Sequence, residues 1–139
     1  SHYRQVVSAC VLEHVEDPIN HLKCLRRVCH PDGTLAVIVP NARSIHRSDG
    51  VERGFIPAND YLSKLDHQIG HRRWYTSGRL YEDVLAAGFS VKNEVGIMIK
   101  PLPNQQMTEL GNVAIEDLYQ LGLGQPQLAA EILCLAVPA

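Results

Sequence analysis

The fold of this chain is decided by residues 6–18, which read VVSACVLEHVEDP. The apolar first half of this stretch is typical of a buried strand. Asp17 and Pro18 are a strong signal for the start of a helix, because Asp caps the first free N–H groups and Pro fits the first helical position. The stretch therefore predicts a strand and a helix with Glu13 and His14 between them. In open α/β sheets, ligands bind at this carboxyl end of a strand.

Outward from this stretch, helical spacings and apolar runs alternate along the chain. The predicted elements are a helix over residues 18–29, a turn at 31–33, a strand over 34–39, a helix over 77–87, a strand over 90–99, a helix over 105–121 and a strand over 132–137. Thr76 and Gly88 are start and stop signals for the second helix. The uninterrupted apolar strand that ends at Pro40 is expected to be covered on both faces. This alternation predicts an α/β fold with a doubly wound sheet.

Residues 41–75 do not continue this pattern. Arg, His, Ser, Asp and Gly are scattered there with little periodicity, around a short helix predicted near residues 59–65. Connections of this length without regular structure are usually functional or mobile. Two interpretations stay open for this insertion: a lid over a binding site and a plain surface segment.

Five motifs are spread over roughly the whole chain. They are VLEHV-x-DP at residues 11–18, LRRV-x-HPDGTL at 25–35, VPN at 39–41, GHRR-x-YT at 70–76 and AGF at 87–89. Together they resemble the second half of a class I S-adenosylmethionine-dependent methyltransferase of the type 11/12-like group. The combination is fairly specific for that superfamily, but it says little about the molecule that accepts the methyl group.

The resemblance implies a partial Rossmann-like sheet, built from the fourth to seventh strands of that fold with the last one antiparallel between its neighbours. It implies S-adenosylmethionine as the cofactor of the complete protein. The residues whose backbone is expected to pass the cofactor are Ala9, Cys10, Val11 and Leu12. In the family a Gly-rich turn and an acidic residue also hold the cofactor, and both would lie upstream of Ser1. We therefore expect residues 1–139 to be the C-terminal portion of a methyltransferase domain, a fragment that is inactive alone, with residues 41–75 over the acceptor pocket.

Methyl transfer needs an aligned acceptor and, for an oxygen or nitrogen acceptor, a base that removes a proton. A His suits that task because its pKa lies close to neutrality. We predict that His14 is the base and that His71 positions the acceptor in the same pocket. The alternative for His14 is a capping or packing histidine at the entrance of a helix.

Further residues are predicted to bind the acceptor. They are Glu13, Asn41, His67 and Arg72. The alternatives are a first-turn carboxylate for Glu13 and a turn-forming residue for Asn41. Arg72, with Arg73 and Trp74 beside it, is suited to an anionic acceptor, or else belongs to a solvated stretch next to a packed indole.

Glu13 and His14 on one element and a His on another also resemble the metal site of small-RNA 2′-O-methyltransferases. That motif has a further Glu where this chain has Cys10, so no metal is expected. The four cysteines form no CxxC pair, and we predict buried free thiols in a reducing compartment rather than ligands or disulfides. They are Cys10, Cys24, Cys29 and Cys134.

Length and composition restrict the class of protein further. A chain of 139 residues, 45% hydrophobic and 20% charged, is typical of one globular domain with a sizeable core. A net charge of -2 gives no electrostatic reason to expect nucleic acid or an anionic membrane as a partner. There is no signal peptide and no apolar run long enough to span a bilayer, so the sequence predicts a cytoplasmic protein without a membrane partner.

Two functions are compatible with these features. The first is methyl transfer to a small-molecule or saccharide acceptor, with this chain supplying the acceptor-side half of the enzyme. The second is a non-catalytic module, either a degenerate methyltransferase domain or a fragment that keeps an interaction surface. If the first three strands of the fold are absent, the strand at Gln5–Ala9 becomes an exposed apolar edge, and we expect self-association through it, as a dimer.

Overall fold

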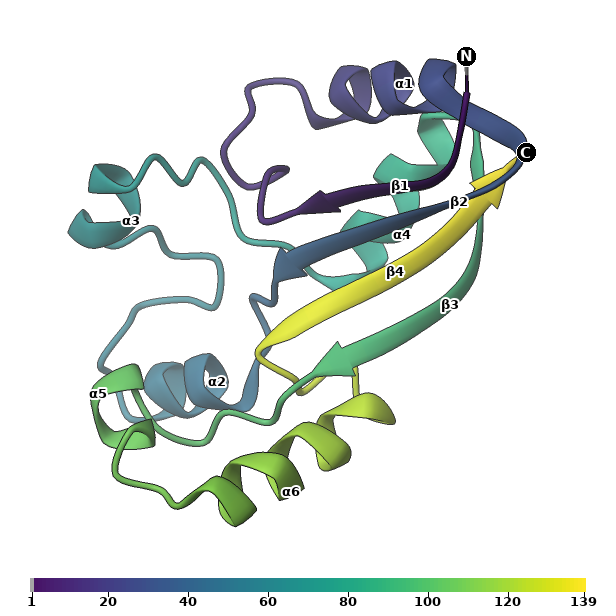
Figure 1. Cartoon of the computed structure of the whole chain (residues 1–139). Helices are drawn as coiled ribbons and strands as arrows, with labels where there is room; N and C mark the ends of the chain where they lie inside the picture. The colour runs from purple at the N-terminus through teal and green to yellow at the C-terminus, as the bar shows by residue number, and fades with distance from the viewer. Residues whose placement is uncertain (1) are drawn as a thin grey trace.

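The computed structural model describes residues 2–139, which fold around a four-stranded sheet (Figure 1). The strands are β1 (Tyr3–Ala9), β2 (Cys29–Pro40), β3 (Phe89–Ile97) and β4 (Glu131–Pro138). Their order across the sheet is β1-β2-β4-β3. β1 and β2 are parallel, whereas β4 runs antiparallel to both of its neighbours. The α/β class and the antiparallel place of the last strand are therefore confirmed.

Six helices flank this sheet in the described part of the chain. They are α1 (Pro18–Val28), α2 (Ile45–Glu52), α3 (Lys64–Gln68), α4 (Ser77–Ala86), α5 (Asn104–Met107) and α6 (Asn112–Leu123). α1 and α4 contact each other, while α2, α3 and α5 gather beyond the sheet edge at which β1, β2 and β3 end (Figure 1). No helix within residues 2–139 is long and apolar enough to cross a membrane.

Local chemistry fixes the two helices that the sequence predicts most clearly. Asp17 caps α1 by accepting a hydrogen bond from the backbone N–H of Asn20 at 2.9 Å. Thr76 caps α4 in the same way, through the N–H of Arg79 at 3.3 Å. Gly88 follows α4 with a φ of +85°, a conformation that a residue with a Cβ adopts at a cost.

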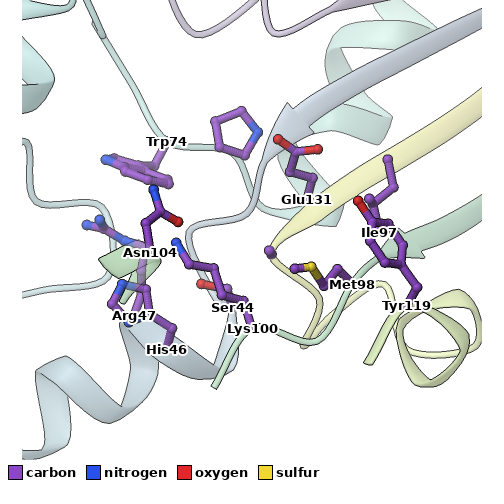
Figure 2. Close-up of a pocket in the computed structure, with 12 residues that line it drawn as sticks. Ser44, His46, Arg47, Trp74, Ile97, Met98, Lys100, Asn104, Tyr119 and Glu131 are labelled. Carbon is purple, nitrogen blue, oxygen red and sulfur yellow. The ribbon is translucent and has the colours of Figure 1, made fainter. Parts of the chain in front are cut away.

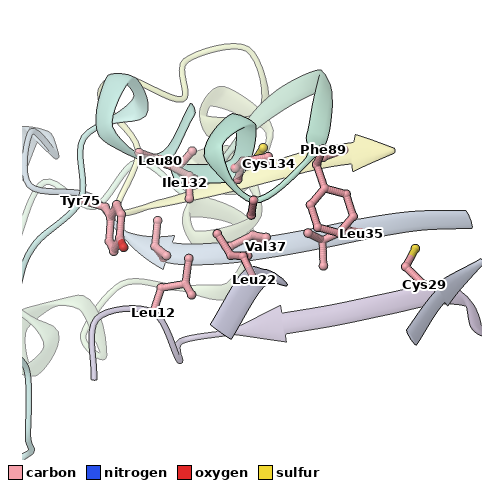
Figure 3. Close-up of a cluster of buried hydrophobic side chains, with 14 residues drawn as sticks. Leu12, Leu22, Cys29, Leu35, Val37, Tyr75, Leu80, Phe89, Ile132 and Cys134 are labelled. Atoms are coloured by element: carbon pink, nitrogen blue, oxygen red, sulfur yellow. The ribbon is translucent and has the colours of Figure 1, made fainter. Parts of the chain in front are cut away.

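The core lies where α1 and α4 pack on one face of the sheet (Figure 3). Its fully buried side chains include Leu22 of α1, Leu80 of α4 and Val37 of β2. Along β2 burial alternates, so that Leu35, Val37 and Val39 are buried but Ala36 and Ile38 are half-buried. The prediction that this strand is covered on both faces is thus wrong for residues 2–139, because only one face of it carries packed helices.

Three further predictions about elements need correction. The turn expected at residues 31–33 is part of β2, where Gly33 lies against the carbonyl of Tyr3 with no room for a Cβ. The short helix expected near 59–65 is α3, and α2 was not predicted at all. The helix expected over 105–121 is two helices, because the chain breaks at Gly111 before α6 begins.

β1 is an edge strand of the sheet. It pairs with β2 on one side, and within the described residues nothing pairs with its other side. Tyr3 is 62% exposed and Val7 is 65% exposed, so the edge carries apolar side chains in solvent. The exposed edge expected at Gln5–Ala9 is therefore present.

Candidate functional site

The first part of the site is the turn that follows β1. Cys10 has a φ of +53°, which is uncommon for a residue with a side chain, and its N–H donates to the carbonyl of Ile38. The chain then turns inward, so that Leu12 joins the core and the Glu13 side chain is 1% exposed. Left-handed residues outside glycine often mark functional sites, and this one lies at the carboxyl end of a strand.

The second part of the site comes from α3 and the segment after it. Ser63 and Asp66 form a capping box, in which the Asp66 carboxylate accepts hydrogen bonds from the backbone and the hydroxyl of Ser63. Gly70 then adopts a φ of +85°, and the N–H of His71 donates to the carbonyl of Asp66. The segment thereby folds back, and His71 faces the turn after β1.

Two arginines bind this segment to the turn after β1. The backbone N–H of Arg72 donates to the carbonyl of Glu13 at 2.7 Å, and its guanidinium donates to the carbonyl of His14 at 3.1 Å. The Arg73 guanidinium donates to three carbonyls of the same turn, those of Leu12, Val15 and Glu16. We call residues 72–73 the arginine clamp. It explains why segments far apart in the sequence are held together.

The arginine clamp brings His14 and His71 into contact. Their ring centroids are 4.8 Å apart, with the rings edge to face. His71 Nδ1 lies 3.2 Å from a carboxylate oxygen of Asp66, although without the alignment of a hydrogen bond, and His14 Nε2 lies 3.9 Å from a Glu13 oxygen. The structure therefore makes a row of carboxylate, imidazole, imidazole and carboxylate.

Of the four side chains in this row, the carboxylate of Glu13 is the one whose burial costs the most free energy of folding. One of its oxygens, Oε2, is buried and has no hydrogen-bond partner in the described residues. Burial raises the pKa of Glu13, and its own backbone N–H and the nearby His14 and His71 oppose that effect incompletely. Burial acts on Asp66 in the same direction, but the hydrogen bonds from Ser63, together with the nearby His71 and Arg47, outweigh it and leave the pKa of Asp66 below its usual range.

Glu13, His14 and His71 also present ligand-type atoms to one another. One such atom from each lies within 4.8 Å of the others, a spacing that a metal ion could bridge. The sequence leads us to expect no metal here, and that expectation stays a prediction.

A cavity of about 360 Å³, whose lining residues Figure 2 shows, lies beside this row. Trp74 connects the two, because its indole lines the cavity and lies edge to face with the ring of His71 at 5.6 Å. Glu131, the first residue of β4, lines the cavity too and accepts from the Cys10 thiol at 3.8 Å. The cavity thus opens where β1, β2 and β3 end, next to the two histidines.

Two other walls of this cavity come from later parts of the chain. Ile97 and Met98 lie at the end of β3, Tyr119 lies on α6, and Lys100 follows β3. Met98 has a φ of +58°, and Gly122 lies so close to its backbone that a Cβ on Gly122 would be 2.6 Å from the Met98 nitrogen. The lining residues His46, Lys100, Tyr119 and Glu131 were not predicted from the sequence, because they lie outside the motifs.

The remaining residues predicted to bind the acceptor lie near this site but do not belong to the row of two carboxylates and two imidazoles. His67 is on the exposed side of α3. Asn41 is buried, and its side-chain amide donates to the carbonyls of Pro126, Gln127 and Ala129. Arg72 is occupied by the carbonyl of His14. The assignment of all three as acceptor contacts stays a prediction. For Asn41, binding an acceptor through its side-chain amide would first require breaking these hydrogen bonds.

The predicted cofactor segment lies at the end of β1. Ala9 and Cys10 are exposed, Val11 is half-buried and Leu12 is in the core. Partial burial of the thiol, with the neighbouring Glu131 and Glu13 carboxylates, raises the pKa of Cys10 to about 11 although the residue as a whole is exposed. The thiol is therefore neutral near pH 7 and is a poor nucleophile. All four cysteines are free thiols, but only Cys29 and Cys134 are buried, so the prediction of burial is wrong for Cys10 and Cys24.

Comparisons with known proteins agree on one family. A family model described as a methyltransferase domain matches residues 1–94. No curated protein matches the chain. Among similar solved structures, an S-adenosylmethionine-dependent methyltransferase from Mesorhizobium loti is 13% identical with a TM-score of 0.60, over 97% of this chain and 61% of that one.

Two other solved structures have the same fold. A possible histamine N-methyltransferase from Thermotoga maritima is 14% identical with a TM-score of 0.58, over 96% of this chain and 55% of that one. A methyltransferase of calicheamicin biosynthesis, solved with S-adenosylhomocysteine bound, is 19% identical with a TM-score of 0.55, over 100% of this chain and 31% of that one. The chain thus spans about a third to three fifths of the length of the structures that it matches.

Proposed function

This chain belongs to the class I S-adenosylmethionine-dependent methyltransferases, and we propose that it supplies the acceptor-side half of an enzyme that methylates a small molecule or a saccharide. The methyl donor of this family is S-adenosylmethionine. In this proposal residues 1–139 are the C-terminal portion of the catalytic domain, and the segment 41–75 covers the acceptor.

The observation that carries this proposal is the contact between His14 and His71 beside the cavity. The two rings lie 4.8 Å apart, and Trp74 joins His71 to the cavity wall. A base must be within hydrogen-bond reach of the proton that it removes. His46 and Glu131 line the cavity itself, whereas His14 and His71 lie beside it, next to Trp74, so an acceptor has to extend past Trp74 to present its proton to His14.

Each histidine has its own task in this mechanism. His14 is 37% exposed at its side chain and takes the proton from a hydroxyl or amine of the acceptor. His71, 11% exposed and held between Asp66 and Trp74, positions the acceptor beside His14. The Asp66 carboxylate lies 3.2 Å from His71 Nδ1 and favours this position of the ring by its charge, while His14 and Trp74 pack against the ring.

The turn after β1 is the proposed place of the cofactor. When bound, S-adenosylmethionine supplies an electrophilic methyl group on its sulfonium. The residues present fit one side of such a molecule, because Ala9 and Cys10 are exposed and the Cys10 thiol is neutral. A neutral thiol does not compete with the acceptor for the methyl group. We expect weak cofactor binding by the 139-residue chain alone, measured by calorimetry.

Turnover of the complete protein tests the proposal. We would measure release of S-adenosylhomocysteine with a panel of phenols, aromatic amines and monosaccharides. The variant His14→Ala is expected to lower turnover by about 10²–10⁴-fold with an oxygen or nitrogen acceptor. The control His30→Ala, at the opposite end of β2, is expected to leave turnover unchanged.

Two results would contradict the proposal. Equal turnover of the His14→Ala and His30→Ala variants would remove His14 as the base, unless the product is methylated on carbon, where no strong base is needed. A complete protein that binds S-adenosylmethionine but methylates no member of the panel would favour the alternative, a non-catalytic interaction module.

A further inference from the structure

The cavity beside the histidines contains a cation without a partner. Lys100 is half-buried, and within residues 2–139 its ammonium group makes no ion pair and no hydrogen bond. Figure 2 shows its side chain extending into the cavity, between Asn104 and Glu131. Burial lowers the pKa of Lys100, and the Glu131 carboxylate opposes this effect only in part. A desolvated ammonium of this kind gains from any anion that enters.

The other cations of the cavity are less available. Arg47 donates to the carbonyls of Asn59 and Tyr61, each at 2.8 Å, and its guanidinium lies 3.8 Å from the centre of the Trp74 ring. Burial lowers the pKa of His46, and Lys100 and Arg47 add to this effect, so His46 is neutral near pH 7. Lys100 is therefore the cation with free donors.

The other lining residues indicate what the uncharged part of a ligand would be. Trp74, Ile97, Met98 and Tyr119 present apolar or aromatic surface. A volume of about 360 Å³ is at the small end of the range for ligand pockets, so a molecule with one or two rings fits. The Glu131 carboxylate lies toward Cys10, 3.8 Å from its thiol, and it repels an anion from that side.

We propose that the methyl acceptor of this site is a small aromatic or apolar molecule with an anionic group, a carboxylate or a phosphate, that Lys100 binds. This inference rests on the proposed function, since it names the substrate class of the same cavity. The ammonium of Lys100 holds the anion by charge-assisted hydrogen bonds, and the ring packs on Trp74. Repulsion by Glu131 keeps the anionic end away from Cys10, so that the opposite end of the acceptor faces His14 and His71.

Ligand binding to the 139-residue chain tests this inference without any methyl transfer. Trp74 is the single tryptophan, so its fluorescence reports on the cavity directly. We would titrate the chain with benzoate, phenyl phosphate, neutral benzamide and cationic benzamidine. The anions are expected to bind at least about ten-fold more tightly than benzamide, because a hydrogen bond to a charged group is worth about 1.5–3 kcal/mol. Benzoate against phenyl phosphate decides between the two anionic groups.

Variants assign this preference to one side chain. Lys100→Met should remove the preference for the anions, whereas Lys100→Arg should keep it. Lys92→Met, on an exposed part of β3, is the matched control and should leave all affinities unchanged. Thermal unfolding of each variant separates lost binding from lost folding.

Three outcomes would overturn the inference. They are equal affinity for benzoate and benzamide, tighter binding of benzamidine, and no binding of any of the four probes. None of them bears on His14, whose role is tested by turnover of the complete protein. Conversely, an anion preference that depends on Lys100 would stand even if His14→Ala left turnover unchanged.

Discussion

The imidazole rings of His14 and His71 lie 4.8 Å apart, at an angle of 68° between their planes. The position of each ring depends on contacts between two segments that are far apart in the sequence. His14 lies in the turn after β1, whereas His71 follows α3, and the arginine clamp of Arg72 and Arg73 holds the two together. The proposed catalytic pair therefore depends on hydrogen bonds to backbone carbonyls.

Loss of the Arg73 guanidinium should destabilise the protein and separate His71 from His14. In Arg73→Met the apolar stem remains, but the carbonyls of Leu12, Val15 and Glu16 lose their donor. Because hydrogen bonds to charged groups contribute about 1.5–3 kcal/mol, we expect a loss of about 2–3 kcal/mol in the free energy of unfolding. Urea unfolding measures it, with Arg27→Met on the exposed side of α1 as the control. Equal midpoints for the two variants would show that the clamp is not needed.

Asp66 should act on turnover through His71 and on stability through Ser63. Asp66→Asn removes the charge that lies 3.2 Å from His71 Nδ1 and weakens the capping box of α3. In the complete protein we expect a smaller fall in turnover than for His14→Ala, and a loss of about 1 kcal/mol in stability from the cap. Asp117→Asn, exposed on α6, is the control.

The pH dependence of the Asp66 effect has a definite sign. The pKa of Asp66 is lowered on folding, so its ionised form contributes stability above the unfolded pKa of about 3.9. That contribution declines as the pH falls through the lower, folded pKa. The stability difference between wild type and Asp66→Asn should therefore be largest near neutrality and shrink in acid. A difference that grows in acid would contradict the assignment.

Much of the fold follows from local signals in the sequence. The N-cap of Asp17 with Pro18, the N-cap of Thr76 and the left-handed Gly88 each act within a few residues, and α1 and α4 have the expected positions. α2 has no such signal, because Ser44 makes no side-chain cap. It is held by tertiary contacts instead, such as those of Arg47 with Asn59 and Trp74.

The candidate site also has some features that the sequence predicts and others that it does not. The meeting of His14 and His71 was predicted, because His14 follows a strand end and the insertion returns to the sheet just after His71. The structure brings the two rings together, although neither of them lines the cavity. The arrival of Lys100 and Glu131 could not be predicted, because it depends on the left-handed Met98 and on the register of β4. Neither feature has a signature in the sequence.

The exposed edge of β1 should make the chain self-associate. Its outer backbone groups have no partner in the described residues, and Val7 is 65% exposed. Edges of this kind recruit further strands, and a Lys on the edge blocks such pairing. Sedimentation should therefore show a concentration-dependent dimer for the wild type and a monomer for Val7→Lys. The matched control Val113→Lys, at a 77% exposed position of α6, should still dimerise, and a wild-type chain that stays monomeric at high concentration would refute the edge model.

Ionised Glu13 should cost the protein stability at neutral pH. Its carboxylate is 1% exposed with one oxygen unpartnered, and burial raises its pKa on folding. The folded protein therefore holds the proton to higher pH than the unfolded chain does, so stability falls as pH rises through the folded pKa. Glu13→Gln removes this ionisation. Its free energy of unfolding should exceed that of the wild type at pH 7.5.

The advantage of Glu13→Gln should disappear below the unfolded pKa of about 4.3, where wild-type Glu13 is protonated in both states. Urea unfolding at a series of pH values measures it, and Glu16→Gln, at an exposed position of the same turn, should follow the wild type throughout. If Glu13→Gln were instead the less stable protein at pH 7.5, the carboxylate would be compensated by positive charge on His14 or His71. In that case the comparison would be repeated with His14 and His71 both changed to Gln. In this background, adding Glu13→Gln should raise the free energy of unfolding at pH 7.5.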